Sequence, residues 1–366
     1  MVTTYLALSK VAQLNGQEGI INGFNYMMHG ANDHFHMILK RDNPDYPSLP
    51  GLTVLIGGMW IVNLNYWGCN QYITQRALGA NLKTARSGIL FAAFLKLLMP
   101  VIVVLPGIAA YVLHQKGLLH QEMMQAGETN PDRAYPVLLN LLPAGLKGLS
   151  IAALTAAIVA SLAGKVNSIS TIFTLDIYKK HLNKEASEKK LVSTGKLVVL
   201  LAMIIGVIIA PHLGIDKKGG FEFIQEYTGF VSPGIFAMFI LGFFWKKATS
   251  NAALFATIGG FSLSFILKKL PVWGVNLEGL KNIGFSSLIT QADGSKLWEI
   301  PFLDRMGIVF GFCIIGMAII SYLEMGKQNN PKGLEVDRSM FKTSPSFTVG
   351  ALIIVGVLTA LYSIFW

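Results

Sequence analysis

Charged side chains are scarce in this sequence. Asp, Glu, Lys and Arg make up 14% of the 366 residues, whereas soluble domains carry about 25%. Hydrophobic residues reach 52%, and the mean hydropathy is +0.52. Composition therefore excludes an ordinary soluble domain and predicts a polytopic membrane protein. The net charge of +10 reflects the Lys and Arg that gather in cytoplasmic loops of such proteins, so we expect no nucleic-acid partner.

Cysteines and catalytic motifs are equally sparse. The two cysteines, Cys69 and Cys313, lie in separate apolar segments, which excludes a disulfide framework and a cysteine metal site. The sequence shows no paired carboxylates, Ser-His-Asp set, phosphate loop or metal-binding cluster. We therefore do not expect an enzyme.

Long apolar runs dominate instead and predict an all-α architecture with about eight transmembrane helices. The expected spans are about 50–75, 87–114, 146–179, 190–213, 219–245, 249–271, 303–325 and 346–366. Pro106 and Pro233, each followed by glycine, should kink or interrupt their spans. Residues 1–48 contain no run of membrane length and predict a long loop with a short amphipathic helix near Thr4 to Leu14.

The links between spans predict the orientation. Four short links are basic, namely 76–86, 177–196, 246–248 and 326–345, and the alternate links 1–49, 115–145, 214–218 and 272–302 are mostly longer and more mixed. The positive-inside rule places the basic set in the cytoplasm and both termini outside. Lys268 and Lys269 then fall on the outer side. We further expect a short surface helix at 135–143 and an irregular link at 272–302.

Polar side chains are concentrated in GGMWIVNLNYWGCNQYITQRALGANLKTAR, residues 57–86. At membrane depth such groups must face protein or water, so the stretch predicts a binding site. The polar candidates are Asn63, Asn65, Tyr66, Asn70 and Gln71. Two other interpretations stay open, because amides also join membrane helices and aromatic residues also anchor at the interface.

Three further residues stand out by their depth or position. Lys96 lies about nine residues into the second span, about 14 Å from its start, beyond the reach of a snorkelling side chain. It therefore needs a polar partner or a water-filled cavity, unless the span edge is drawn wrongly. Gln225 is either a binding residue or a helix-joining amide. Glu226 is either a second membrane carboxylate or a side chain that reaches water near the outer end.

Small residues follow one face of the third span. Ala157, Ala160, Ser161, Gly164 and Ser168 recur at helical spacing. Serine hydroxyls, together with carbonyls freed by a helix irregularity, are ligands suited to sodium. Close helix packing explains the same pattern equally well.

Several stretches together resemble one family. Residues 57–86, 91–112, 154–180 and 223–247 and the closing SIFW are similar to the sodium/solute symporter family, most of all to bacterial sodium/galactose cotransporters of the sodium/glucose type. The resemblance covers almost the whole chain and implies part of an inverted five-helix-repeat, leucine-transporter-like fold. It begins at the sixth core helix, so N-terminal helices carrying the first repeat are expected upstream in a longer protein.

The resemblance also implies a division of the chain. It implies an extracellular loop at 1–49, the second core repeat at 50–245 and peripheral helices at 246–366.

The resemblance implies roles for particular residues. Asn63, Tyr66, Lys96 and Gln225 match positions that hold a sugar, with the Tyr66 ring covering it and Trp67 behind that ring. Amides offer both a donor and an acceptor, and a ring face stacks on sugar C–H groups, so the residue types suit this role.

It implies a sodium site as well. The matching positions are Ala157, Ala160 and Ser161, completed by carbonyls of the first core helix. Ala160 departs from the family pattern, where serine is usual, so one side-chain oxygen is missing.

The resulting hypothesis is sodium-coupled symport of a galactose- or glucose-like sugar by alternating access, in the cell (inner) membrane. Sodium would be the coupling ion, and the lipid bilayer and the sugar would be the partners. The alternatives are a sodium symporter of another solute, such as myo-inositol, sialic acid or an amino acid, and a transport-dead membrane sensor on the same fold.

Overall fold

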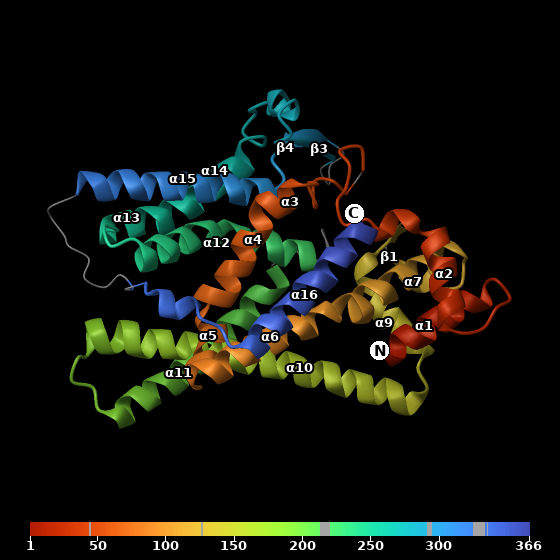
Figure 1. The fold of residues 1–366 in the computed structure, drawn as a ribbon, viewed down its shortest axis with the longest axis horizontal. Coiled ribbons are helices and arrows are strands. Elements are labelled where there is room, and N and C mark those ends of the chain that lie inside the picture. The colour runs from red at the N-terminus through yellow and green to blue at the C-terminus, as the bar shows by residue number, and fades with distance from the viewer. Residues whose placement is uncertain (44, 126, 213–219, 291–294, 325–333, 335) are drawn as a thin grey trace. The chain divides into compact units, whose positions relative to one another are not determined.

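Helices form most of the protein in its computed structural model (Figure 1). The structure describes residues 1–43, 45–125, 127–212, 220–290, 295–324, 334 and 336–366. The predicted link 214–218 and much of the link 326–345 lie outside these residues.

The α-helices follow in chain order as α1 (Val2–Gln13), α2 (Ile20–Gly30), α3 (Thr53–Ile56), α4 (Gly58–Leu64), α5 (Gln71–Leu78), α6 (Leu82–Leu97), α7 (Leu105–Gln115), α8 (His120–Met123), α9 (Ala134–Leu138), α10 (Ala144–Thr171), α11 (Glu188–Ile209), α12 (Gly220–Phe244), α13 (Ser250–Leu254), α14 (Gly260–Lys269), α15 (Phe302–Leu323) and α16 (Pro345–Ile364). The π-helical segments are Asn65–Cys69, Pro100–Val104, Ile172–Leu182 and Phe255–Gly259. The strands are β1 (Met124–Gln125), β2 (Glu128–Thr129), β3 (Ser287–Thr290) and β4 (Lys296–Glu299). They form two antiparallel hairpins, β1–β2 and β3–β4.

Seven continuous helices among the described residues are long and apolar enough to cross a bilayer. They are Leu82–Gln115, Ala144–Leu182, Glu188–His212, Phe223–Phe244, Ser250–Lys269, Phe302–Leu323 and Pro345–Ile364. Seven of the predicted spans are thus matched. The eighth, 50–75, is divided into α3, α4, the π-helical segment Asn65–Cys69 and the start of α5, because Gly57 and Asn70 leave the helical conformation.

The two prolines that were predicted to kink or interrupt their spans have different surroundings. A π-helical segment, Pro100–Val104, ends just before the helix that contains Pro106. Helix α12, by contrast, runs without interruption through Pro233.

Two compact units make up the chain. Unit 1 comprises Met1–Phe35 and Gln75–Gly220, and unit 2 comprises His36–Thr74 and Phe221–Trp366. The division of the sequence into a loop, a core repeat and peripheral helices stays a prediction.

Unit 1 has its buried core where α1, α2, α7 and α9 meet. Val11, Met27, Leu113 and Leu138 are among its most buried residues. The helix predicted near Thr4 to Leu14 is confirmed as α1, but the loop prediction for the rest of 1–48 missed α2. That helix forms because its apolar face packs on α1 and α7, a contact that local sequence does not reveal.

The short helix predicted at 135–143 is confirmed as α9 and the 3-10 turn that follows it. Its residues Val137, Leu138 and Leu139 are buried against the unit 1 core. The segment therefore packs one face on that core and leaves Tyr135, Pro136 and Asn140 exposed at the surface of unit 1.

The long apolar helices of unit 1 bury little of themselves within the unit. Helices α10 and α11 lie side by side (Figure 1) and are joined by the hydrogen bond that Ser170 Oγ donates to the Gly195 carbonyl, 2.9 Å long. In each long helix, almost none of the most apolar 18-residue stretch is buried. The buried share is 0% for Leu82–Gln115 and Glu188–His212 and 6% for Ala144–Leu182. Such extended apolar faces need lipid or further protein around them, as expected for a multi-pass membrane protein.

Unit 2 packs α12, α13, α14 and α15 around small residues. Its core contains Ala237, Ala252, Val309, Cys313 and Met317. The prediction of an irregular link at 272–302 is wrong in part, because β3 and β4 pair there with Leu288 opposite Trp298. Residues along β3 alternate between half-buried and exposed, but the sequence SLIT shows no matching alternation of polar and apolar residues.

Two glycines bring α12 and α14 into close contact. A Cβ on Gly260 would lie 2.8 Å from Gly234 Cα and 3.0 Å from Cys313 Sγ. Because a backbone atom cannot move aside cheaply, Gly260→Ala should lower the free energy of unfolding by about 1–3 kcal/mol. Thermal unfolding of the detergent-solubilised protein measures this loss.

The matched control is Gly259→Ala. The added Cβ there would meet only the Phe255 ring, at an ordinary 3.5 Å, so stability should hold or rise slightly. Equal destabilisation by both variants would contradict the proposed close contact.

Candidate functional site

The polar stretch of residues 57–71 is built as an interrupted helix. Helix α4 begins after Gly57, which has φ −88° and ψ −112°, and it continues into the π-helical segment Asn65–Cys69. Asn70 is extended, with φ −85° and ψ 116°, and its Oδ1 accepts a hydrogen bond from the Tyr72 amide at 3.1 Å. Non-helical backbone at membrane depth is tolerated only inside protein or beside a water-filled cavity. The break therefore marks a place where a polar ligand could bind.

This interrupted helix packs against α12 in unit 2. Asn65 Nδ2 donates to Ser232 Oγ at 3.3 Å. About one turn before Asn65 and one turn after Ser232, the Trp60 and Phe236 rings meet edge to face, with centroids 5.8 Å apart. Gln225 lies on the same helix about two turns before Ser232. The structure thus places the polar stretch beside the helix that carries Gln225.

The side chains of Asn63 and Tyr66 are exposed at the surface of unit 2. The Asn63 side chain is exposed, and its Nδ2 donates to the Met59 carbonyl at 2.9 Å. Tyr66 is 39% exposed, and its ring meets Trp67 edge to face with centroids 5.7 Å apart. Trp67 and Gln225 are half-buried. An amide and an aromatic ring three residues apart are neighbours on a helical surface and offer a paired contact for a hydroxylated ring.

Lys96 and the sodium candidates belong to unit 1. Lys96 is exposed in the last turn of α6, just before the π-helical segment Pro100–Val104. Whether it joins Asn63, Tyr66 and Gln225 at one cavity stays a prediction.

Ala157, Ala160 and Ser161 lie exposed in the middle of α10. The helix irregularity expected to free their carbonyls is not at these residues. Helix α10 is regular to Thr171, and the π-helical segment starts at Ile172. Oxygen ligands for sodium would therefore have to be completed by a second segment.

A group of four charges in unit 2, two of them buried and two partly buried, was not predicted. We call it the charge ring, and it consists of Glu226 on α12, Lys268 on α14, Glu299 on β4 and Arg305 on α15. Lys268 Nζ lies 2.7 Å from Glu226 Oε1 and 2.5 Å from Glu299 Oε1. Arg305 lies 3.0 Å and 3.5 Å from the same two atoms.

The charge ring corrects two interpretations of the sequence. Glu226 does not reach water, because the residue is 7% exposed and pairs with both cations. Lys268, which conflicted with the predicted orientation, is a counter-ion of Glu226 and Glu299, and the orientation stays a prediction. The sequence places these charges near the ends of apolar spans or in the link between them, but it carries no signal for which of them pair.

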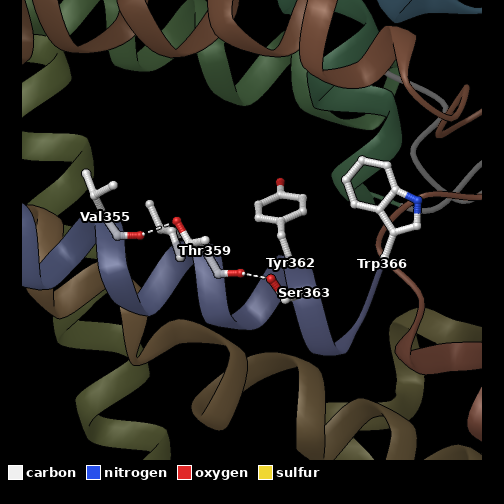
Figure 2. A pocket seen from close by; sticks show the side chains of 6 residues that line it. Val355, Thr359, Tyr362, Ser363 and Trp366 are labelled. Carbon is white, nitrogen blue, oxygen red and sulfur yellow. Dashed lines mark hydrogen bonds between the residues drawn. The ribbon is translucent and has the colours of Figure 1, made fainter.

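A shallow open hollow of about 540 Å³ lies along α16. Figure 2 shows the side chains of Val355, Thr359, Tyr362 and Trp366 on one side of this helix. The hydroxyls of Thr359 and Ser363 donate to carbonyls one turn earlier in the helix, at 2.9 and 2.8 Å. The hollow is mainly apolar and contains none of the predicted site residues.

The tie between Asn65 and Ser232 gives a stability test. Ser232→Ala would remove the acceptor of the Asn65 amide, whose Oδ1 is already buried without a hydrogen-bond partner. Unfolding free energy should fall by about 1 kcal/mol. Asn63→Ala should change it by less than about 0.5 kcal/mol, because that side chain is exposed. Chemical denaturation of both variants measures the difference, and a larger loss for Asn63→Ala would refute this assignment.

Comparisons with known proteins agree with this architecture. The chain is 42% identical over its whole length to the sodium/glucose cotransporter of Vibrio parahaemolyticus and spans 63% of that protein. It is 39% and 38% identical to the sodium/myo-inositol cotransporters 2 of Oryctolagus cuniculus and Homo sapiens, over 64% of the chain and 35% of each relative.

The solved structure of a Na+-coupled sialic acid symporter in a substrate-bound outward-open state has the same fold. Its TM-score is 0.60 at 21% identity, over 87% of this chain and 60% of that one. The family model for the sodium:solute symporter family matches residues 4–260. The chain therefore belongs to the sodium:solute symporter family.

Proposed function

We propose that the full-length protein is a sodium-coupled symporter of a sugar that works by alternating access in the cell (inner) membrane. The observation that carries the proposal is the interrupted helix of residues 57–71, which presents exposed Asn63 and Tyr66 beside α12 in a chain of this family. The relatives that the chain resembles are named as cotransporters of glucose and myo-inositol, both neutral polyhydroxylated rings, which supports a sugar as cargo.

Each proposed contact suits a neutral hydroxylated ring. The Asn63 and Gln225 amides can donate to and accept from sugar hydroxyls at once, and the Lys96 ammonium donates to hydroxyl oxygens. The Tyr66 ring stacks on the C–H face of the sugar, with Trp67 holding it from behind. Each neutral hydrogen bond contributes about 1 kcal/mol, so the cargo is held tightly enough to be selected and weakly enough to leave.

Sodium is proposed to bind at the exposed face of α10. The Ala157 and Ala160 carbonyls and the Ser161 hydroxyl supply hard oxygen ligands, completed by carbonyls of the first core helix in the full-length protein. Bound sodium favours the outward-open state, and its loss to the cytoplasm loosens the Tyr66 gate and releases the sugar. A ligand shifts such an equilibrium only through its different affinity for the two states.

Uptake of radiolabelled glucose or galactose into proteoliposomes of the full-length protein tests the proposal. An inward sodium gradient should drive accumulation, and potassium should not replace sodium. Gln225→Ala and Asn63→Ala should raise the KM for sugar about tenfold, because each loses a donor and an acceptor. Thr228→Ala is the matched control on α12, since its hydroxyl donates to the Ile224 carbonyl of the same helix.

Three outcomes would overturn parts of this proposal. Sugar uptake indifferent to sodium would refute the coupling. Competition by myo-inositol, sialic acid or an amino acid in place of hexoses would identify another cargo, and sugar binding without uptake would identify a sensor.

The alanine at position 160 gives a second test. Ala160→Ser adds a hydroxyl oxygen to the proposed sodium face, so half-saturating sodium should fall about fivefold, as one added ligand of about 1 kcal/mol predicts. Val159→Thr is the control, because it adds a hydroxyl one residue away and about 100° round the helix. The sodium dependence of uptake measures both, and equal effects of the two variants would contradict the site.

A further inference from the structure

The charge ring attaches α12 to three other elements at the level of Gln225. Glu226 follows Gln225 directly, so the two side chains leave α12 about 100° apart. Both ring cations bond to Glu226 Oε1, Lys268 from α14 and Arg305 from α15. The rotation of α12 about its own axis therefore decides at the same time where Glu226 meets its cations and where Gln225 points.

Two more contacts fix the same face of α12 on α15. The Arg305 guanidinium lies over the Phe230 ring, 5.2 Å from its centroid. Gly229 leaves room for the Met306 side chain, which occupies the place that a Cβ would take. Glu226, Gly229 and Phe230 follow one another at helical spacing, so all three belong to the face turned toward α15.

The ring is compensated within itself. Two carboxylates meet two cations, and each cation lies within 3.5 Å of both carboxylates. The Arg305 and Glu226 side chains are almost fully buried, at 4% and 9% exposure. Removing one partner of such a group is costly, because the remaining charge stays buried without compensation. The ring thus holds one arrangement firmly.

We infer that Arg305 and Lys268 are positioning residues that set the direction of Gln225 toward the cargo by fixing the rotation of α12. This inference rests on the proposed function, in which Gln225 binds the sugar. The ring itself does not touch the cargo. It acts through Glu226 and the backbone of α12.

The test is sugar uptake by the full-length protein in proteoliposomes. Arg305→Gln and Lys268→Gln should each raise the KM for sugar about tenfold, because a shifted Gln225 loses its hydrogen bonds to the cargo. The sodium concentration that gives half-maximal uptake, measured at saturating sugar, should change by less than about twofold, which is close to the error of such measurements. A merely structural role would lower the amount of active protein and the maximal rate but leave the KM unchanged.

The chain offers a matched control. Lys269 is the next residue to Lys268 and contributes none of the four ion pairs of the ring. Lys269→Gln removes the same charge at nearly the same place and should leave the sugar KM unchanged. If Arg305→Gln fails to fold, Arg305→Lys serves instead, because it keeps the charge but loses the forked contact, and it should raise the KM about threefold. An unchanged KM in the folded ring variants would overturn the inference.

A second measurement separates this inference from the proposed function. In the full-length protein with Cys69→Ser, Cys313→Ala and every further cysteine replaced by serine, Gln225→Cys is labelled with a water-soluble maleimide. Adding Arg305→Gln should change the labelling rate at position 225 several-fold, while Lys269→Gln should not. Ser339→Cys, outside the ring, should react at the same rate in all backgrounds. If the parent protein takes up no sugar, the proposed function fails, and an unchanged labelling rate at 225 would then refute the positioning role on its own.

Discussion

Pairing of polar groups inside apolar helices is the constraint on which unit 2 depends. A charge or an amide that lies between apolar helices must find a partner, since water is absent and an unpaired group costs several kcal/mol. Two sets of side chains in unit 2 show such pairing, although Asn65 Oδ1 and both Asp304 carboxylate oxygens are buried without a hydrogen-bond partner. The charge ring pairs the carboxylates of Glu226 and Glu299 with two cations, one from α14 and one from α15, and Asn65 bonds to Ser232 on α12. Both fix the elements around α12 relative to one another.

Hydropathy predicted the long helices well because each apolar run carries its own signal. It did not show how the stretch at 50–75 is divided, since the non-helical backbone at Gly57 and Asn70 has no signature in average hydropathy. Helix α2 and the β3–β4 hairpin were missed for a related reason. Both are short, and both are stabilised by contacts with a partner segment that local sequence does not reveal, such as α2 with α7 and Leu288 with Trp298 on the paired strand.

The side chains around the candidate site also differ in how far the sequence alone reveals them. Asn63, Tyr66 and Trp67 could be proposed from the sequence because they cluster within five positions of one apolar stretch. The charge ring could not, because Glu226 and Arg305 are 79 residues apart, and Lys268 and Glu299 are 31 apart. A lone glutamate near the end of an apolar span then resembles a residue that reaches water, and only the fold shows that it meets a counter-ion.

Within unit 2, neutral and charged groups have separate tasks. A transporter must exchange its contacts with the cargo in every cycle, and neutral amides allow this because each hydrogen bond to water or to a sugar is worth a similar amount. Charged pairs in a buried place do not exchange in this way, since opening one leaves an uncompensated charge. Asn63 and Tyr66 are exposed and neutral, whereas Glu226 and Arg305 are buried and paired. The helix that carries Gln225 is thus held by interactions that do not exchange, while the contacts proposed for the cargo are the ones that can.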